Sequence, residues 1–181
     1  IIKNISFSIE KNSCVGILGE SGSGKSITCK SILNILNDNF NINGEIIFDG
    51  KNLINYTEKE MKNIRGKQIC MILQNPMTSF DPLFTIQNQM VETFLEHLNI
   101  SAKDALELAK ESLEKMRMKE IDVVLKKYPH ELSGGMLQRV MIAIAIALKP
   151  KLIIADEPTT AIDSLNQKDI IEEFKILKNE I

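Results

Sequence analysis

The sequence predicts an α/β fold in which helices cover a parallel sheet. Short apolar runs with the length of buried strands alternate with longer segments of helical periodicity, a pattern typical of parallel sheets. Three polar clusters also follow predicted strands directly, at residues 19–26, 74 and 156–157. Because ligands gather beyond the carboxyl ends of parallel strands, we expect these clusters to share one edge of the sheet.

The first third of the chain is predicted to place strands around one helix. Alternating or continuous apolar residues mark the strands, and short polar stretches between them mark turns. The predicted elements are strands at Ile5–Ile9, Cys14–Leu18 and Glu45–Phe48, turns at 10–13 and 49–52, and a helix at Ile27–Leu36.

The rest of the chain is predicted to be mostly helical. A capping-box pattern at Thr57–Glu60 starts a short helix, and no strand is predicted between Thr85 and Leu148. Within that region Ser101 is a predicted N-cap, followed by an apolar stripe that packs inside a helical lobe. The other elements are strands at Ile69–Leu73 and Leu152–Ala155, a buried helix at Gly134–Leu148 and a last helix capped by Ser164.

The composition is ordinary for a globular protein. Its length of 181 residues is enough for one well-buried domain, and 44% of these residues are hydrophobic and 25% are charged. The net charge of −2 argues against nucleic acid as a partner, because domains that bind it are usually basic. No apolar run approaches the roughly 20 residues that span a bilayer, and the N-terminus does not look like a signal peptide.

Cysteine and histidine are not predicted to bind a metal. Cys14, Cys29 and Cys70 have no metal-type spacing, so we expect reduced thiols in the core of a cytosolic protein. His97 and His130 are far apart in the sequence and lack paired ligands nearby, so we expect them at the surface or in packing roles.

The most specific motif is Gly19-Glu20-Ser21-Gly22-Ser23-Gly24-Lys25-Ser26, with the spacing G-x-x-x-x-G-K-S between a predicted strand and a predicted helix. Its glycines let the backbone curl so that N–H groups point at phosphate oxygens, and the helix adds the positive end of its dipole. Lys25 suits the β- and γ-phosphates, and the Ser26 hydroxyl suits Mg²⁺. The motif predicts a nucleoside triphosphate site.

Two carboxylates follow the apolar strand Leu152–Ala155. A buried strand holds Asp156 and Glu157 at the sheet edge, at a fixed position relative to the phosphate loop. We predict that Asp156 holds Mg²⁺, directly or through water, and that Glu157 polarises the water that attacks the γ-phosphate.

Ser133-Gly134-Gly135 comes before a predicted helix and forms a second anion-binding helix N-terminus. Gln138-Arg139 follows in the same helix, the acidic strand lies downstream and Gln74 upstream. This ordered set resembles the ATP-binding-cassette (ABC) ATPases over essentially the whole chain. In the resemblance, Ser133 to Gln138 match the signature motif, Gln74 matches the Q-loop glutamine, and Thr160–Asp163 match the D-loop.

The resemblance implies an α/β fold of the P-loop NTPase (ABC ATPase) class, with a parallel-sheet core, N-terminal antiparallel strands and an inserted α-helical subdomain. The implied core covers 1–84 and 149–181, and the helical subdomain covers 85–148. The implied cofactors are ATP and Mg²⁺. The implied site residues are Glu157, Gln74 and Lys25 in catalysis, residues 19–26 with Ser133, Gly134, Gly135, Gln138 and Asp163 at the nucleotide, and Ser26, Gln74 and Asp156 at Mg²⁺.

Several longer segments of the chain are similar to those of the ATPases that drive import of peptides and nickel. They are the segment Gln74–Leu83, the stretch Tyr128–Leu132 and the run Ala155–Thr160; Ser26–Cys29 and Gly134–Arg139 look especially like ATPases for nickel or metallophore uptake. This likeness implies an importer subunit and leaves the solute open among nickel, a metallophore and oligopeptides.

The resemblance also implies partners and a location. Two ATPase domains, identical or paralogous, would dimerise head to tail, so that each ATP lies between the phosphate loop of one and the Ser133–Gly135 motif of the other. A membrane permease would dock its coupling helix near Gln74–Pro82, with a substrate-binding protein acting indirectly and no nucleic acid bound. The subunit would lie peripherally on the cytoplasmic face of the membrane.

Two alternatives remain beside the importer: a soluble ABC-type ATPase acting on ribosomes or DNA, and a nucleotide-dependent regulator that binds ATP without hydrolysing it. The family also places an adenine-stacking aromatic before the first strand and a switch histidine after the last helix. Neither is found in this sequence, so we expect the chain to be a fragment that lacks both ends.

Overall fold

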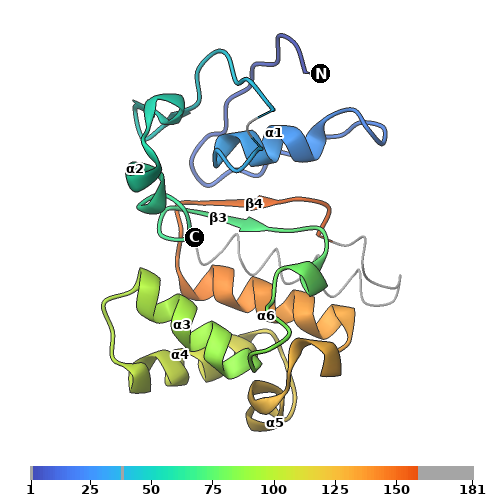
Figure 1. Cartoon of the computed structure of the whole chain (residues 1–181), viewed down its shortest axis with the longest axis vertical. Coiled ribbons are helices and arrows are strands. Elements are labelled where there is room, and N and C mark those ends of the chain that lie inside the picture. Colours follow the sequence, from blue (N-terminus) through green and yellow to red (C-terminus); the bar gives the residue numbers. More distant parts are fainter. Residues whose placement is uncertain (1, 38, 159–181) are drawn as a thin grey trace. The chain divides into compact units, whose positions relative to one another are not determined.

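The computed structural model describes residues 2–37 and 39–158. The chain forms two compact units that divide between Arg65 and Gly66. The elements of both units are labelled in Figure 1. The predicted helix after Ser164 and the D-loop at Thr160–Asp163 lie outside the described residues.

The first unit contains the predicted phosphate-loop helix. Helix α1 spans Lys25–Ile32, with Gly24 at its N-cap in the left-handed conformation (φ 100°). It begins two residues earlier than the predicted helix, and it ends four residues earlier, at Ile32 instead of Leu36. Asn34 takes a positive φ of 50°, a conformation that no α-helix continues, so the chain leaves the helix there.

A short hairpin and a capped helix complete the first unit. Strands β1 (Ile47–Phe48) and β2 (Lys51–Asn52) pair antiparallel through a turn in which Asp49 and Gly50 both have positive φ, as a two-residue type I′ turn requires. Residues 51–52, predicted as turn, therefore form the second strand. A 3₁₀ turn, Leu53–Asn55, leads to α2 at Glu58–Lys62. The predicted capping box is confirmed, because Thr57 and Glu60 exchange both of its hydrogen bonds.

The two N-terminal strands predicted at Ile5–Ile9 and Cys14–Leu18 are wrong: the structure assigns neither helix nor strand there. The turn between them does form, with Ser13 donating to the Glu10 carbonyl. A strand is stable only when its backbone groups pair with a neighbour. These segments have no ladder partner among the described residues, and Leu18 is 96% exposed. Cys14 is likewise exposed, against the prediction of a core thiol, whereas Cys29 and Cys70 are buried as predicted.

The second unit is built on two parallel strands. Strand β3 (Ile69–Ile72) pairs with β4 (Leu152–Ala155) in the register Ile69 to Leu152 through Ile72 to Ala155. The ladder continues at both ends, where Lys151 N–H donates to the Gln68 carbonyl and Asp156 N–H donates to the Ile72 carbonyl. The prediction of parallel apolar strands here is confirmed.

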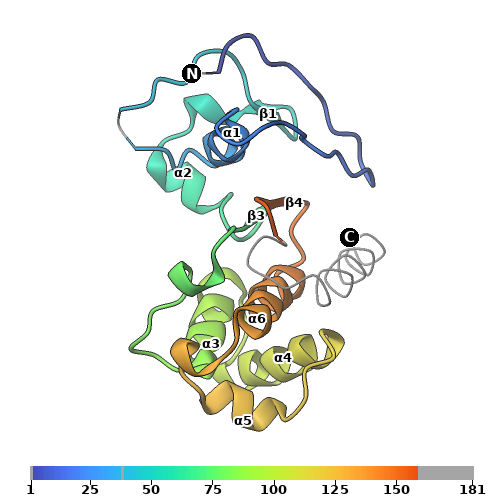
Figure 2. The same ribbon diagram turned by 90° about the vertical axis from the view of Figure 1, so that its right-hand side faces the viewer.

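Four helices pack below this strand pair. They are α3 (Ile86–His97), α4 (Ala102–Lys115), α5 (Ile121–Lys126) and α6 (Gly134–Ala147), with 3₁₀ turns at Pro76–Thr78 (η2) and Pro129–Glu131 (η3). Figures 1 and 2 show α6 along one face of the strands, with α3 and α4 on its far side. The predicted absence of strands from Thr85 to Leu148 is confirmed, and the subdomain boundaries drawn there stay a prediction.

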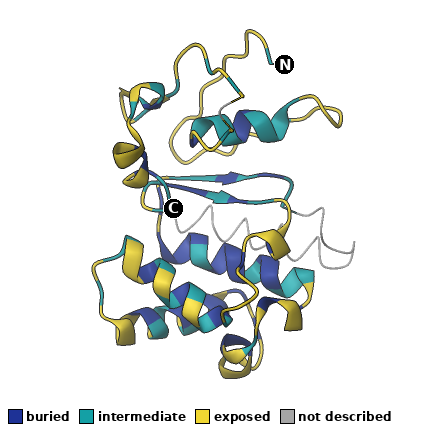
Figure 3. Ribbon diagram, in the orientation of Figure 1, coloured by how far each residue is buried: buried dark blue, intermediate teal, exposed yellow. Residues whose placement is uncertain are grey.

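Helix α6 is the centre of the core of this unit. Nine of its 14 residues are buried, and Figure 3 shows it as the most continuously buried element of the unit. The predicted stripe of α4 packs inward through Ala105, Ala109 and Leu113, each 0% exposed. Ser101 caps α4 by accepting from the Asp104 N–H at 3.2 Å, as predicted.

The second unit begins with a tight contact between Gly66 and His97. Gly66 has φ +77°, and a Cβ placed on it would lie 2.5 Å from the His97 imidazole. The imidazole is half-buried, which lowers the pKa of His97 below its ordinary value. Nearby, the Cys70 thiol donates to the Gly66 carbonyl at 3.2 Å, and burial raises the pKa of that thiol to about 11. His97 therefore has a packing role, as predicted.

Gly66→Ala is expected to destabilise the protein more than Gly50→Ala, as measured by chemical denaturation. Both substitutions place a Cβ at a positive φ, which costs about 1–2 kcal/mol, but only Gly66 also meets a neighbouring side chain. Combining Gly66→Ala with His97→Ala should remove the excess cost. Equal losses for Gly66→Ala and Gly50→Ala would contradict the steric role of His97.

Candidate functional site

The phosphate loop curls around the ammonium group of its own lysine. Lys25 Nζ donates to the Gly19 carbonyl at 2.9 Å and to the Glu20 carbonyl at 3.1 Å. Lys25 and Ser26 are the first two residues of α1, so both lie at the positive end of its dipole. The structure therefore gathers residues 19–26 into one loop at a helix N-terminus, as the motif predicts.

The backbone of this loop is shaped for glycine. Gly22 and Gly24 have φ +80° and +100°, and a Cβ on Gly19 would lie 2.7 Å from Ser23 Oγ. Ser23 N–H donates to the Glu20 carbonyl at 3.2 Å, which tightens the turn. Such a loop presents backbone N–H groups on an exposed surface, so it fits the polyphosphate that the motif predicts.

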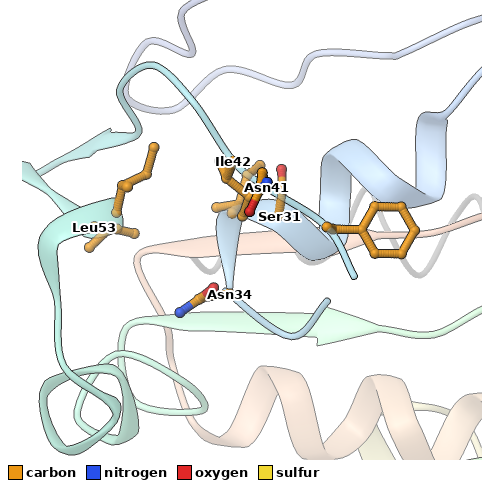
Figure 4. A pocket seen from close by; sticks show the side chains of 8 residues that line it. Ser31, Asn34, Asn41, Ile42 and Leu53 are labelled. Atoms are coloured by element: carbon orange, nitrogen blue, oxygen red, sulfur yellow. The ribbon is translucent and has the colours of Figure 1, made fainter. Parts of the chain in front are cut away.

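A pocket of about 190 Å³ lies elsewhere in the first unit. Figure 4 shows Ser31, Asn34, Asn41, Ile42 and Leu53 among the side chains that line it. None of the predicted nucleotide ligands lines this pocket. It is therefore separate from the candidate nucleotide site.

In the second unit the structure brings together two predicted catalytic residues that are 83 positions apart. Gln74 Nε2 donates to Glu157 Oε2 at 2.7 Å. Gln74 follows β3 and Glu157 follows β4, so their contact results from the parallel pairing of those strands. Glu157 takes a positive φ of 47°, an uncommon conformation for glutamate that turns the chain just after the strand.

Asp156 lies between this contact and the sheet. Its side chain is 5% exposed, and its N–H is the last rung of the β3–β4 ladder. A buried carboxylate at the end of a strand has little freedom to move, which suits a ligand that must hold a cation in one place. No group of three or more acidic, histidine or cysteine side chains forms a ready metal cage within the described part of the chain. Mg²⁺ does not need one, because it keeps waters and substrate oxygens as ligands.

The predicted signature segment forms the N-terminus of α6. Ser133 caps the helix by accepting from the Met136 N–H at 3.3 Å, and Gly134 and Gly135 open its first turn. Nothing lies within 4 Å of a Cβ built on Gly135, so internal packing does not explain glycine there. The exposed Ser133 and the open first turn leave backbone N–H groups available to an anion.

Gln138 is placed differently from the other predicted nucleotide ligands. Its side chain is 0% exposed, and neither its Oε1 nor its Nε2 has a hydrogen-bond partner among the described residues. A contact with nucleotide would require this side chain to leave the core, so its predicted role stays a prediction. Asp163, the last predicted ligand, lies outside the described residues.

Sequence reasoning missed Arg65. Its guanidinium donates to the carbonyls of Leu33 and Asn34, just after the phosphate-loop helix, and pairs with Glu58. The contacting carbonyls are 32 and 31 positions away in the sequence, so no local pattern could have indicated the contact.

The family model described as ABC transporter matches residues 2–160. The chain belongs to the ABC transporter family. This membership confirms the resemblance drawn from the ordered motifs, and with it the P-loop NTPase fold class and the ATP-binding type of domain.

Similar proteins are ATP-binding proteins of import systems. The chain is 46% identical over 178 residues to the metal-staphylopine import system ATP-binding protein CntD of Staphylococcus aureus, covering 98% of this chain and 66% of that protein. It is 44% identical over 182 residues to the oligopeptide transport ATP-binding protein OppD of Bacillus subtilis, covering 99% of this chain and 51% of that protein. The chain thus spans between half and two thirds of these relatives.

A solved structure supports the fold. The dimeric ATP-binding cassette MJ0796, in a post-hydrolysis state bound to ADP and phosphate, matches with a TM-score of 0.86 and 30% identity, covering 98% of this chain and 75% of that one. Within the described residues of our chain, no helix has both the length and the apolar character needed to cross a membrane.

Gln138→Met is expected to raise the free energy of unfolding by about 1–3 kcal/mol, because an apolar side chain of similar length removes two buried atoms that have no hydrogen-bond partner among the described residues. Chemical denaturation measures the change. Gln87→Met, a half-buried site on α3 with no such orphaned atoms, is the matched control and should be near neutral. A loss of stability in Gln138→Met would show that the amide has partners in solution.

Proposed function

We propose that this chain is the ATP-binding and ATP-hydrolysing part of an importer subunit. The hydrogen bond between Gln74 and Glu157 is the observation that carries the proposal. It joins a polar amide and a carboxylate at the carboxyl ends of two parallel strands, where ligands bind in such sheets. Membership of the ABC transporter family supports ATP as the nucleotide.

Each predicted site residue has a distinct task in this proposal. Lys25 and the loop N–H groups hold the phosphates, and Lys25 exchanges its present carbonyl contacts for phosphate oxygens. Glu157 accepts a proton from the attacking water, and Gln74 fixes the orientation of its carboxylate. Ser26, Asp156 and Gln74 would hold Mg²⁺, which when bound neutralises charge that develops on the phosphates.

The second nucleotide-binding surface is proposed to come from another domain. The open N-terminus of α6 at Ser133–Gly135 suits the phosphates of an ATP held by a partner's phosphate loop. The dimeric state named for the MJ0796 cassette supports a dimer of two such domains. The proposed partner is a second ATPase domain, identical or paralogous, and Asp163, outside the described residues, stays a predicted nucleotide ligand.

The proposed cargo is a metal chelate, nickel, or an oligopeptide. The names of the similar importer proteins support the metal chelate and the oligopeptide, and nickel stays an expectation from the sequence. In this proposal the subunit lies on the cytoplasmic face of the membrane and docks on a permease, and a substrate-binding protein delivers the cargo. The exposed Met77 lies in the segment Gln74–Pro82 proposed to contact the permease, and the exposed Leu83 and Phe84 follow it directly.

Glu157→Gln in the complete protein is expected to lower the rate of ATP hydrolysis by about 10²–10⁴-fold, because the water loses its base. ATP-induced dimerisation, followed by light scattering, should be retained. Glu111→Gln, an exposed carboxylate on α4, is the matched control and should hydrolyse ATP normally. A wild type that binds ATP without hydrolysing it would favour the regulator instead, and unchanged turnover in Glu157→Gln would place the base elsewhere.

The cargo is tested with the complete transporter in proteoliposomes. Because cargo-loaded binding protein stimulates the ATPase only when it fits the permease, chelated nickel and an oligopeptide mixture should differ in the stimulation they give. We expect the metal chelate to stimulate more, in line with the higher identity to CntD. Stimulation by peptide alone would assign the chain to peptide uptake, and no stimulation by either would contradict the importer proposal.

A further inference from the structure

Arg65 forms a clamp at the end of the phosphate-loop helix. Its Nε donates to the Leu33 carbonyl at 2.9 Å, and its Nη2 donates to the Asn34 carbonyl at 2.9 Å. The same guanidinium pairs with both carboxylate oxygens of Glu58 through Nη1 and Nη2. One planar group therefore joins the end of α1 to the first turn of α2.

The carbonyl contacts matter because they satisfy groups that a helix end leaves without partners. Leu33 is the C-cap of α1 and is only 4% exposed, so its carbonyl has limited access to water. The positive guanidinium also complements the negative end of the helix dipole. A side chain without a charged, planar group could not make these contacts together with the ion pair.

The other side of the clamp is firmly held. Arg65 N–H donates to the Met61 carbonyl at 2.9 Å, which ties its backbone to α2. Met61 is 0% exposed and Ile64 is 6% exposed, so the residues around this bond are buried. The capping box at Thr57 fixes the start of the same helix. The guanidinium thus extends from a fixed support.

Helix α1 transmits this constraint to the phosphate loop. It has eight residues and is therefore about 12 Å long, short enough to behave as a rigid rod. Lys25 and Ser26 stand at its first turn, and Arg65 holds the chain just beyond its last turn. A tilt at one end moves the other, and displaced loop donors would make weaker hydrogen bonds to the phosphates, which lowers affinity for the nucleotide.

From these contacts we infer that Arg65 is a positioning residue for the nucleotide. By capping α1 at Leu33 and Asn34, it fixes the orientation of the helix and of the loop that holds the phosphates. The inference rests on the proposed function of that loop. Arg65 is also the last residue of the first unit, four positions before β3, which leads to Gln74. In the sequence, the clamp thus directly precedes the unit that contains Gln74.

The test compares ATP hydrolysis by the complete protein with Arg65→Ala and Arg65→Lys, over a range of ATP concentrations. Loss of two charge-assisted hydrogen bonds should raise the KM for ATP about tenfold in Arg65→Ala, with kcat within about twofold. Arg65→Lys should raise it about threefold, because a single ammonium cannot reach both carbonyls and the carboxylate. Affinity for a fluorescent ATP analogue is measured alongside.

Two controls separate the carbonyl contacts from charge. Lys62→Ala removes a cation of α2, and Glu58→Gln removes the ion pair, whose carboxylate is 64% exposed and so contributes little. Both should keep KM within about twofold of the wild type. An effect of Glu58→Gln as large as that of Arg65→Ala would overturn the assignment to helix capping.

Other outcomes also decide the inference. An unchanged KM and analogue affinity in folded Arg65→Ala would overturn it, as would a fall in kcat alone. If circular dichroism shows that Arg65→Ala is unfolded, Arg65→Lys decides: a rise in KM of about threefold supports the inference, and an unchanged KM and analogue affinity overturn it. If the wild type hydrolyses no ATP, the proposed function fails, and the analogue affinities of the wild type and the two Arg65 variants still test the clamp.

Discussion

The pairing of β3 with β4 is the constraint on which the contact between Gln74 and Glu157 depends. Four residues of each strand form a parallel ladder between segments about 80 positions apart. Parallel pairing places both carboxyl ends at the same edge, so Gln74 and Glu157 meet there. The cost of closing so long a loop is offset by burying these apolar strands against α6. The contact between Gln74 and Glu157 is therefore a consequence of strand packing more than of any attraction between the two side chains.

The first unit is held in its conformation by helix caps and turns more than by a sheet. The hairpin turn at Asp49-Gly50, the capping box of α2 and the Arg65 clamp each satisfy backbone groups that would otherwise lack partners. The phosphate loop is held in the same way, by the contacts of Lys25 with its own carbonyls. A loop whose lysine already contacts backbone oxygens is arranged to receive phosphate oxygens without large rearrangement.

The two ends of helix α6 have different surroundings: its first turn is open and its later turns are buried. In the proposed function its first turn stays open for an anion, while the turns after it fill the core of the second unit. Gln138 lies at this boundary: it belongs to the predicted signature segment, yet its side-chain amide is buried with no hydrogen-bond partner among the residues that the structure describes. Buried polar groups without partners are rare, since each costs free energy. The position therefore marks a compromise between recognition at the helix end and packing along its length.

The sequence by itself determined the motifs, the helices with strong caps and the apolar strands at Ile69–Leu73 and Leu152–Ala155, because these depend on local spacing and hydrophobic pattern. Tertiary structure decided what depends on partners distant in sequence. The segment 14–18 has the pattern of a strand, but a pattern supplies no partner strand, so none forms there. The Arg65 contacts, the burial of Gln138 and the distance between Gln74 and Glu157 could not be predicted, because they join residues that only the folded chain brings together.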